Sequence, residues 1–435
     1  MTEVSVVPSD MSDPEAHASC DVLIIGGGMV GLTLAEALAG AVTGGAGTLR
    51  IAVVDREDPA RAEEAGFDGR TTAIALGGKH ILDALGLWDG LAREASPILD
   101  IRVSEAESTL FLHYDHRDVG DEPLGFIVEN RFIRRALMEK VRARPSIGLW
   151  RGHLLKRLDQ SAVPGAPAAL AVLAGPDGRE KRVRARLVVA ADGRPSRLAR
   201  EAGIPVSDWR YHQASIVCTI AHSRPHQGVA IEHFLPAGPF AVLPMQHNRS
   251  SIVWTEDKDL AAALVRLPED EFLEEFRRRF GEWYGDLSLV GPRALYPLGV
   301  TFAHRLYQDR LVLVGDAAHA IHPIAGQGFN LALRDVATLA ELIVDHHRLG
   351  LDLAGPLLEA YDRARRADTL ALLAATDGLN RLFSNDIAPV RVLRGLGLAA
   401  VNNMPALKRF FMRHAMGIET GSADSMPRLA RGLPL

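Results

Sequence analysis

Three glycines near the start of the chain have the spacing that brings a backbone close to a phosphate group. They are Gly26, Gly28 and Gly31, which together fit the pattern G-x-G-x-x-G. Because these positions lack side chains, a pyrophosphate can reach the N–H groups at the N-terminus of the next helix. Asp55 follows 24 positions after Gly31, where its carboxylate can accept hydrogen bonds from ribose hydroxyls. The pattern predicts a bound dinucleotide rather than only a tight turn, but it does not distinguish NAD from FAD.

A second glycine-rich loop, in the last third of the chain, favours FAD. Gly315 and Asp316 end a short apolar run, and an aspartate just after a strand can hold the ribityl hydroxyls of a flavin. Gly326 and Gly328 then free backbone N–H groups before a helix. This suits the negative charge that a reduced flavin places near its pyrimidine ring. Asn330 completes the same motif.

Two histidines, His319 and His322, lie in this second loop. Histidine titrates near neutral pH, so each is a candidate acid or base. In a packed loop, however, a hydrogen-bonded structural histidine is the more common case. We assign neither residue to proton transfer.

The elements that must position these loops are typical of an α/β fold. Residues 21–25 and 51–54 are short apolar runs of β-type residues on either side of a helical stretch, so they predict a βαβ unit with parallel strands. Two later apolar runs, 187–191 and 311–314, each end in a loop with an aspartate and return the chain to this sheet. Alternating apolar and polar residues between these runs predict antiparallel strands.

We therefore expect an α/β protein with a Rossmann-like FAD-binding domain, an inserted, mostly antiparallel β-sheet domain for the substrate, and C-terminal helices. The FAD-binding domain is predicted to be discontinuous and to comprise residues 18–95, 128–203 and 300–385. The substrate-binding sheet is assigned to residues 96–127 and 204–299. A C-terminal helical region and a flexible tail are assigned to residues 386–420 and 1–17, respectively.

Composition argues against several other classes of function. The chain has 435 residues, of which 47% are hydrophobic, and this allows a large core and more than one domain. Its formal net charge of -5 gives no general attraction to nucleic acid, and no zinc-ligand spacing is present. The two cysteines are too few for a disulfide framework, which fits a reducing cytoplasm. A membrane-spanning helix is not expected, because no stretch of 18 uncharged apolar residues occurs.

Several further segments, taken together, resemble one family of flavoproteins. They are Asp68-Gly-Arg70 with the residues up to Leu76, Gly125 to Arg131, Val189 to Arg197, and Glu232-His-Phe234 with Gly238 to Pro244. With the two glycine loops, these segments are similar to the FAD-dependent monooxygenases of the para-hydroxybenzoate hydroxylase type, and most closely to the branch that hydroxylates the ring of ubiquinone precursors. The resemblance runs from about Asp21 to Gly417.

The resemblance implies contacts with FAD for four more residues. Arg70 would reach the cofactor, Arg131 would contact FAD, and Asp192 would lie near its pyrophosphate and the nicotinamide donor. The backbone carbonyl of Pro323 would lie beside the reacting edge of the flavin. Simpler roles stay open: Arg70 in a surface salt bridge, Asp192 capping or tightening a turn, and Pro323 only ending a loop before a helix.

The resemblance also implies a reaction. The chain would be a monooxygenase that hydroxylates the aromatic ring of a polyprenylated phenol in ubiquinone biosynthesis. NAD(P)H or another electron donor would reduce the FAD, and O2 would then form a flavin hydroperoxide that attacks the ring. The alternatives are a related flavoprotein that acts on another aromatic substrate, and a non-catalytic nucleotide-binding subunit of a quinone-biosynthesis complex.

A basic amphipathic stretch near the C-terminus indicates contact with a membrane surface. Between residues 390 and 418, basic side chains alternate with large apolar ones and no acidic residue occurs. Such a stretch can rest on anionic lipid, and a polyprenylated substrate would dwell in the bilayer. We therefore expect a cytoplasmic protein peripherally associated with the inner membrane, alongside other quinone-biosynthesis proteins. The alternative is that these helices pack on the catalytic core, and both can hold for different faces.

Overall fold

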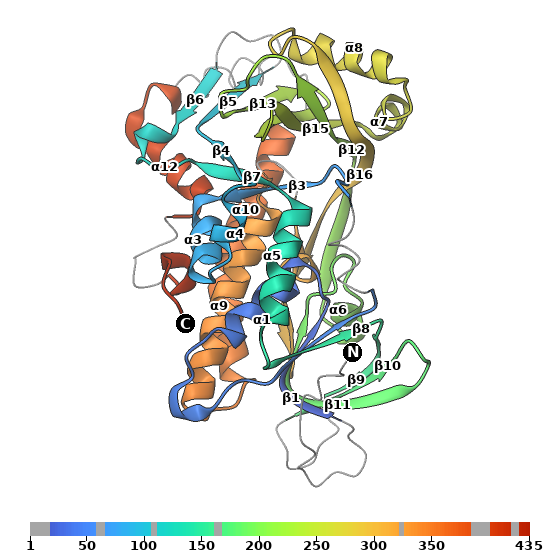
Figure 1. The fold of residues 1–435 in the computed structure, drawn as a ribbon, viewed down its shortest axis with the longest axis vertical. Helices are drawn as coiled ribbons and strands as arrows, with labels where there is room; N and C mark the ends of the chain where they lie inside the picture. The colour runs from blue at the N-terminus through green and yellow to red at the C-terminus, as the bar shows by residue number, and fades with distance from the viewer. Residues whose placement is uncertain are drawn as a thin grey trace.

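The strand before the first glycine turn lies inside a mainly parallel sheet, in the lower part of Figure 1. β1 (Ala18–Ile25) pairs in parallel with β2 (Ile51–Asp55) and β11 (Glu180–Ala190), and β11 pairs in parallel with β18 (Leu311–Leu313). Their apolar residues are buried, as unbroken apolar runs require of strands covered on both faces. The other strands are β8 (Ile147–Arg151), β9 (Leu154–Asp159), β10 (Ala169–Ala174) and β17 (Tyr307–Gln308).

The computed structural model describes residues 18–57, 66–105, 111–160, 168–321, 326–383, 401–418 and 426–435. Several predictions fall outside these residues: the flexible tail 1–17, the candidate His322, the role of Pro323, and the parts of the C-terminal helical region and of the basic amphipathic stretch that precede residue 401.

Helices cover the parallel sheet and bring the second glycine loop next to the first. α1 (Met29–Ala39) follows β1 directly and packs against α5 (Asn130–Arg142) and α9 (Gly328–Arg348). Aliphatic side chains of these helices form one large core with the sheet. A long helix, α10 (Pro356–Phe383), packs on α9 (Figure 1). The shorter helical elements are η1 (Gly44–Ala46), α3 (Leu76–Ala84), α4 (Trp88–Leu91), η2 (His116–Asp118), α6 (Arg197–Glu201), η3 (Gly315–Ala317) and η6 (Leu429–Arg431).

A second, mainly antiparallel sheet lies in the upper part of Figure 1. Two helices, α7 (Lys258–Leu264) and α8 (Glu269–Phe280), cover one face, where Phe240, Trp254 and Phe276 belong to a core rich in aromatic rings. The strands are β5 (Asp100–Glu105), β6 (Phe111–Asp115), β12 (Val206–His222), β13 (Val229–Leu235), β14 (Gly238–Met245), β15 (Arg249–Asp257), β16 (Leu287–Ala303) and β19 (His319–Ala320).

A three-stranded sheet joins the two larger ones. β7 (Gly125–Glu129) pairs with β3 (Thr71–Ala75) and with β4 (Ser96–Ile98). The hydroxyl of Thr71 donates a 2.8 Å hydrogen bond to that of Ser251, which ties β3 to β15. Apolar residues from this sheet, from the second sheet and from α12 (Pro405–Met416) pack together, and we call them the junction cluster. Its buried members are Leu76, Ile98, Leu124, Ile127, Ala230, Met245, Met412 and Met416.

The predicted fold class is confirmed: a parallel sheet with helices, a mostly antiparallel sheet, and helices toward the C-terminus. The predicted domain boundaries stay a prediction. The small junction sheet was not foreseen, because its strands of 3 to 5 residues are too short to show a period. Among the helices within the described residues, none is long and apolar enough to cross a membrane.

Candidate cofactor site

The carboxyl ends of four neighbouring parallel strands meet at one edge of the first sheet. In the register of these strands, Ile25 lies between Val54 of β2 and Ala190 of β11, and Ala190 lies beside Leu313 of β18. The segments that follow these strands therefore start side by side. They contain the predicted site residues Gly26, Asp192 and Asp316, and Asp55 is the last residue of β2 at the same edge. The structure thus brings together two loops that are almost 300 residues apart in the sequence, at the edge where α/β sheets bind ligands.

Glycine is favoured at the three positions of the first turn for two different structural reasons. Gly26 has a φ of +116°, and a Cβ there would lie 2.2 Å from the carbonyl oxygen of Ala191. At Gly31 a Cβ would lie 2.0 Å from the carbonyl oxygen of Gly26. Both are therefore required by the packing of the turn itself. A Cβ at Gly28 would meet nothing within 4 Å, so this glycine leaves open space in front of α1, where a phosphate fits.

The N-terminus of α9 repeats this arrangement. Gly328 is its first residue, and a Cβ there would also meet nothing within 4 Å. Neither α1 nor α9 has an acidic residue in its first turn, and neither N-cap residue supplies a side-chain cap. Both helices thus present partial positive charge and N–H groups without partners inside the helix, and within the described residues no side chain of their first turns or N-caps neutralises them. Gly326 serves packing instead, because its φ is +61° and a Cβ would lie 2.8 Å from the Cβ of Ala73.

Asp55 and Asp316 supply carboxylates at this edge. Asp55 ends β2 and accepts hydrogen bonds from the backbone N–H groups of Gly27 and Glu57, so its carboxylate lies directly beside the glycine turn. Asp316 lies in η3 with an exposed side chain. Although the side chain is open on one side, the protein atoms around the carboxyl keep water away from it, and this desolvation raises its pKa. The nearby charges of His319 and Arg194 act in the opposite direction. Its position suits an acceptor for sugar or ribityl hydroxyls.

A buried charge network fixes the Asp316 loop. Asp335 on α9 is fully buried, and its carboxylate accepts hydrogen bonds from the N–H of Gly315 at 3.0 Å and from Nε2 of His319 at 2.7 Å. Its other oxygen accepts from Nε of Arg365 on α10 at 2.8 Å. Burial acts to raise the pKa of Asp335, but His319 and Arg365 outweigh it and lower that pKa to about 2. His319 therefore has the structural role that the sequence favoured.

Sequence reasoning missed Asp335 and Arg365. They lie on consecutive helices next to other charged residues, with Arg334 beside Asp335 and Arg366 beside Arg365, a pattern that equally describes exposed helix positions. No local signal separates the two cases, since the partners are 30 residues apart.

Three other predicted cofactor contacts have protein partners here. Arg70 is exposed and pairs with Asp68 at 2.6 Å, while Nε of Arg131 donates to the carboxylate of Glu129 at 2.7 Å. The carboxylate of Asp192 accepts from the hydroxyl of Ser196 at 2.8 Å and from the N–H of Arg197 at 3.0 Å, at the start of α6. These are the simpler roles that were left open for Arg70 and Asp192. Contact of Arg70, Arg131 and Asp192 with FAD stays a prediction.

Asn330 joins the two halves of the site. Its Oδ1 accepts from the N–H of Ala75 at 2.9 Å, and its Nδ2 donates to the carbonyl of Ala73 at 2.9 Å. The side chain thus continues the hydrogen bonding of β3 onto the first turn of α9. This clamp holds the segment that begins with Arg70 beside the open N-terminus at Gly328.

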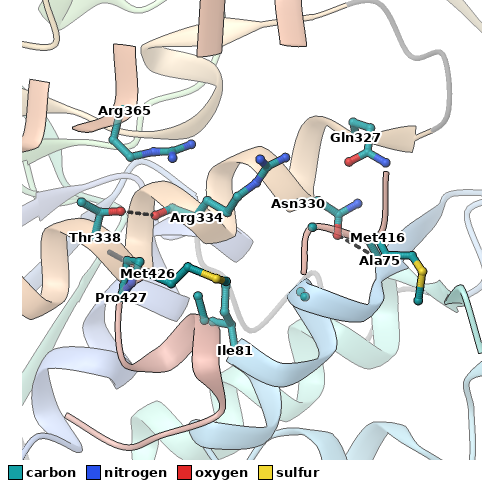
Figure 2. Close-up of a pocket in the computed structure, with 14 residues that line it drawn as sticks. Ala75, Ile81, Gln327, Asn330, Arg334, Thr338, Arg365, Met416, Met426 and Pro427 are labelled. Atoms are coloured by element: carbon teal, nitrogen blue, oxygen red, sulfur yellow. Dashed lines mark hydrogen bonds between the residues drawn. The ribbon is translucent and has the colours of Figure 1, made fainter. Parts of the chain in front are cut away.

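A cavity beside α9 is too small to hold a flavin. Figure 2 shows it lined by Gln327 and Asn330 at the start of α9, by Arg334 further along, and by Arg365. Its volume is about 40 Å³, whereas small-molecule pockets usually exceed roughly 300 Å³. The fit of a dinucleotide therefore depends on the open edge between α1 and α9.

Comparisons with known proteins identify the class of ligand. A family model described as an FAD binding domain matches residues 19–376. Ubiquinone hydroxylase UbiL of Rhodospirillum rubrum is 50% identical over 422 residues, which cover 97% of this chain and 94% of that protein. The 3-demethoxyubiquinol 3-hydroxylase of Escherichia coli is 31% identical over 405 residues, which cover 92% of this chain and 98% of that protein.

A solved structure shows the same fold. The p-nitrophenol 4-monooxygenase PnpA of Pseudomonas putida superposes with a TM-score of 0.74 at 21% identity, covering 92% of this chain and 98% of that one.

The open space at Gly28 generates a first prediction. Gly28→Val should lower the FAD content of the purified protein at least about tenfold, because a branched side chain would displace the phosphate from N–H groups whose bonds to a charged ligand contribute about 1.5–3 kcal/mol each. The melting temperature of the FAD-free form should hardly change, since nothing lies within 4 Å. Gly31→Val is the contrasting variant and should fail to fold. A Gly28→Val protein with full FAD content would contradict this role.

A second prediction concerns the charge of Asp316. Burial raises its pKa in the folded state, so the folded protein favours the protonated carboxyl and this contribution to stability is lost as pH rises through that pKa. Asp316→Ala should therefore raise the melting temperature of the FAD-free protein at pH 7 relative to wild type, and this difference should shrink below about pH 3.9. FAD content should fall. Calorimetry of both FAD-free proteins across pH, with flavin absorbance, checks both effects; undiminished FAD would refute the ribityl contact.

Proposed function

The chain belongs to the family of FAD-dependent aromatic hydroxylases, and we propose that it hydroxylates the aromatic ring of a polyprenylated phenol in ubiquinone biosynthesis. The observation that carries this proposal is the 50% identity, over nearly the whole chain, to a ubiquinone hydroxylase. The open edge between α1 and α9 supports the cofactor part of the proposal independently of any relative.

In this proposal, the two ends of the site bind different parts of FAD. The turn of Gly26, Gly28 and Gly31 receives the pyrophosphate at α1, and Asp55 accepts from the ribose. Asp316, held by Gly315, accepts from the ribityl chain. Gly328 leaves the N–H groups of α9 free for the pyrimidine end of the ring, and Gly326 lets the loop before them pack closely against Ala73. The remaining contacts are assigned to Arg70, Arg131, Asp192, Asn330 and the carbonyl of Pro323.

Bound FAD supplies the redox chemistry, with NAD(P)H or another donor as the source of electrons and O2 as co-substrate. The protein contributes position and electrostatics. Two helix N-termini stabilise negative charge on the cofactor, and the Asn330 clamp keeps β3 in place beside it. The antiparallel sheet packs on β3 through the junction cluster, and in this proposal it restricts the access of water to the reacting ring.

Contact with a membrane is assigned to α12. Met412 and Met416 on one face are buried in the junction cluster, whereas Phe410 and Phe411 are 52% and 43% exposed. Arg409 is exposed beside them, while Lys408 is paired with Asp118 at 2.7 Å. One face of the helix thus packs on the protein, and the other offers aromatic rings and positive charge to an anionic surface. The protein would act at the inner membrane from the cytoplasmic side, beside other quinone-biosynthesis proteins.

A product assay tests the proposed reaction. FAD-loaded protein, reduced under nitrogen and then exposed to isotopically labelled O2 with 2-geranylphenol in detergent micelles, should yield a product with one labelled oxygen on the ring, detected by mass spectrometry. Gly28→Val protein is the control and should yield none. Oxidation of the reduced protein without labelled product would contradict a hydroxylase. Equal turnover of phenols without a prenyl chain would contradict the substrate class.

A flotation assay tests the membrane contact. Phe410→Ser/Phe411→Ser should weaken binding to vesicles containing phosphatidylglycerol about tenfold or more, because burying a phenylalanine side chain contributes about 1.5–3 kcal/mol. Trp283→Ser, which removes an aromatic ring that is 74% exposed near α8, is the matched control and should bind as wild type does. Unchanged flotation of the double variant would exclude α12 as the membrane contact.

A further inference from the structure

The Glu232 carboxyl lies on the face of the second sheet that is turned toward the junction sheet. Glu232 lies in β13, opposite Val103 of β5 and Ala241 of β14. Its neighbours on the same face of the strand, Ala230 and Phe234, are buried. Within the described residues, no hydrogen bond or ion pair involves the Glu232 side chain. A carboxyl among apolar groups without a partner costs free energy, so packing does not explain this residue.

The alternation of β13 separates the two faces of the sheet. Ile231 and Leu235 point to the aromatic core under α7 and α8. Ala230 instead belongs to the junction cluster, as does the partly buried Leu243 of β14. Glu232, one alternation further along β13 than Ala230, therefore faces the side of the junction sheet and not the helices.

Short links connect this face to the flavin end of the cofactor site. Ala73 packs against the junction cluster and is the residue that a Cβ at Gly326 would touch. The bond from Thr71 to Ser251 holds the same strand, β3, against the sheet. The face that carries Glu232 thus covers the segment that lies beside the N-terminus of α9. An aromatic ring bound between this face of the sheet and the segment beside α9 would lie near Glu232.

Burial alone accounts for the shifted pKa of the Glu232 carboxyl. Burial raises the pKa of its carboxyl to about 7, although the side chain stays partly accessible. Burial is the only cause of this shift, so no charged neighbour fixes its protonation state. On the same sheet, in β6, burial also raises the pKa of Tyr114 to about 12. The titratable and charged groups on the elements packed around this face include Glu105, Tyr114, Glu129, Arg249, Asp377 and Arg413, and Glu129 is paired with Arg249 at 2.9 Å.

We infer that Glu232 accepts the phenolic proton of the substrate as oxygen is transferred to the ring. This inference rests on the proposed function. The phenol O–H bond breaks, and a carboxylate oxygen of Glu232 forms a new O–H bond. The electron pair left on the phenol oxygen enters the ring, and a ring carbon donates a pair to one oxygen atom derived from O2 as the bond between the two oxygen atoms breaks. The second oxygen atom leaves with the electron pair of that bond and takes up protons to become water. The hydrogen on the attacked ring carbon is then lost as a proton and the phenol oxygen regains one, which restores the aromatic ring. The reduced cofactor is the electron source, and the proton leaves Glu232 for solvent after the product departs.

The chemistry favours a base of this strength. A phenol has a pKa of about 10, so it stays neutral at pH 7 and is a poorer electron donor than its phenolate. A carboxylate that titrates near the working pH accepts the proton as positive charge develops on the ring, the condition under which general bases are most effective. Apolar surroundings strengthen the hydrogen bond between the two groups.

The test compares Glu232→Gln with wild type, and His233→Gln is the matched control. His233 lies on the same strand but on the other face, where Nδ1 bonds the hydroxyl of Ser104 at 2.8 Å. Two readouts are taken across pH with 2-geranylphenol: the rate of the oxygen-transfer turnover, and the affinity of FAD-loaded, oxidised protein for the phenol from the change in flavin absorbance.

Wild type should show a rate that is low below pH 7 and rises to a plateau above it, because only the ionised carboxylate accepts a proton. Glu232→Gln should lower the plateau rate about 100-fold and remove this rise, with FAD content unchanged and a melting temperature no lower than that of wild type, because the amide replaces a carboxylate that burial disfavours. Phenol affinity should lose its pH dependence near 7 in the same variant. His233→Gln should keep both profiles.

Each contrary outcome has a distinct meaning. Unchanged pH profiles in Glu232→Gln overturn the inference, and loss of FAD or of folding in that variant assigns Glu232 a structural role and overturns it equally. Wild type that binds the phenol without forming product refutes the proposed function instead. In that case the pH dependence of phenol affinity still decides whether Glu232 meets the phenol.

Discussion

Two helix N-termini that lack their own counter-charge are the constraint on which this structure depends. Unsatisfied N–H groups at the starts of α1 and α9 need an acceptor, and neither first turn supplies a carboxylate. The parallel strands place both helix starts near one sheet edge, and glycines at positions 28 and 328 keep side chains out of the space before them. A ligand with negative charge at two separated points satisfies both ends at once. A dinucleotide carrying an electron-accepting ring meets that requirement.

The charge network around Asp335 follows from this constraint. A loop that ends in the exposed Asp316 must hold its shape while its carboxylate stays free for a ligand. Bonds from Gly315 and His319 to the buried Asp335 fix the loop from behind, and Arg365 of α10 balances the buried charge. Removing one member would leave a charge buried without its partner, which usually costs about 3–5 kcal/mol. The network therefore makes the position of Asp316 depend on the packing of α9 against α10.

Sequence reasoning succeeded where the physical cause is local. A glycine turn between a strand and a helix, and an aspartate directly after a strand, are decided within a few residues, and their placement at one edge follows from parallel pairing. Asn330 was identified as a site residue, but its clamp on β3 joins residues 257 positions apart and leaves no trace in either segment. The Asp335 network and the lone position of Glu232 were missed for the same reason. Both depend on what other elements place opposite a side chain.

The junction cluster connects the membrane-facing helix to the reacting region. Met412 and Met416 of α12 pack in the same cluster as Ala230, which precedes Glu232 on one face of β13, and as Ala73, which touches Gly326. The two parts of a prenylated phenol require different binding surfaces. The prenyl tail requires only apolar surface, whereas the aromatic ring requires one polar group in surroundings that exclude water. The junction cluster offers apolar surface over its whole extent, and Glu232 adds a carboxyl group at its border. The same apolar contacts that hold the two sheets together thus also give the lone carboxyl its raised pKa, so the stability and the chemistry of this region have a common origin.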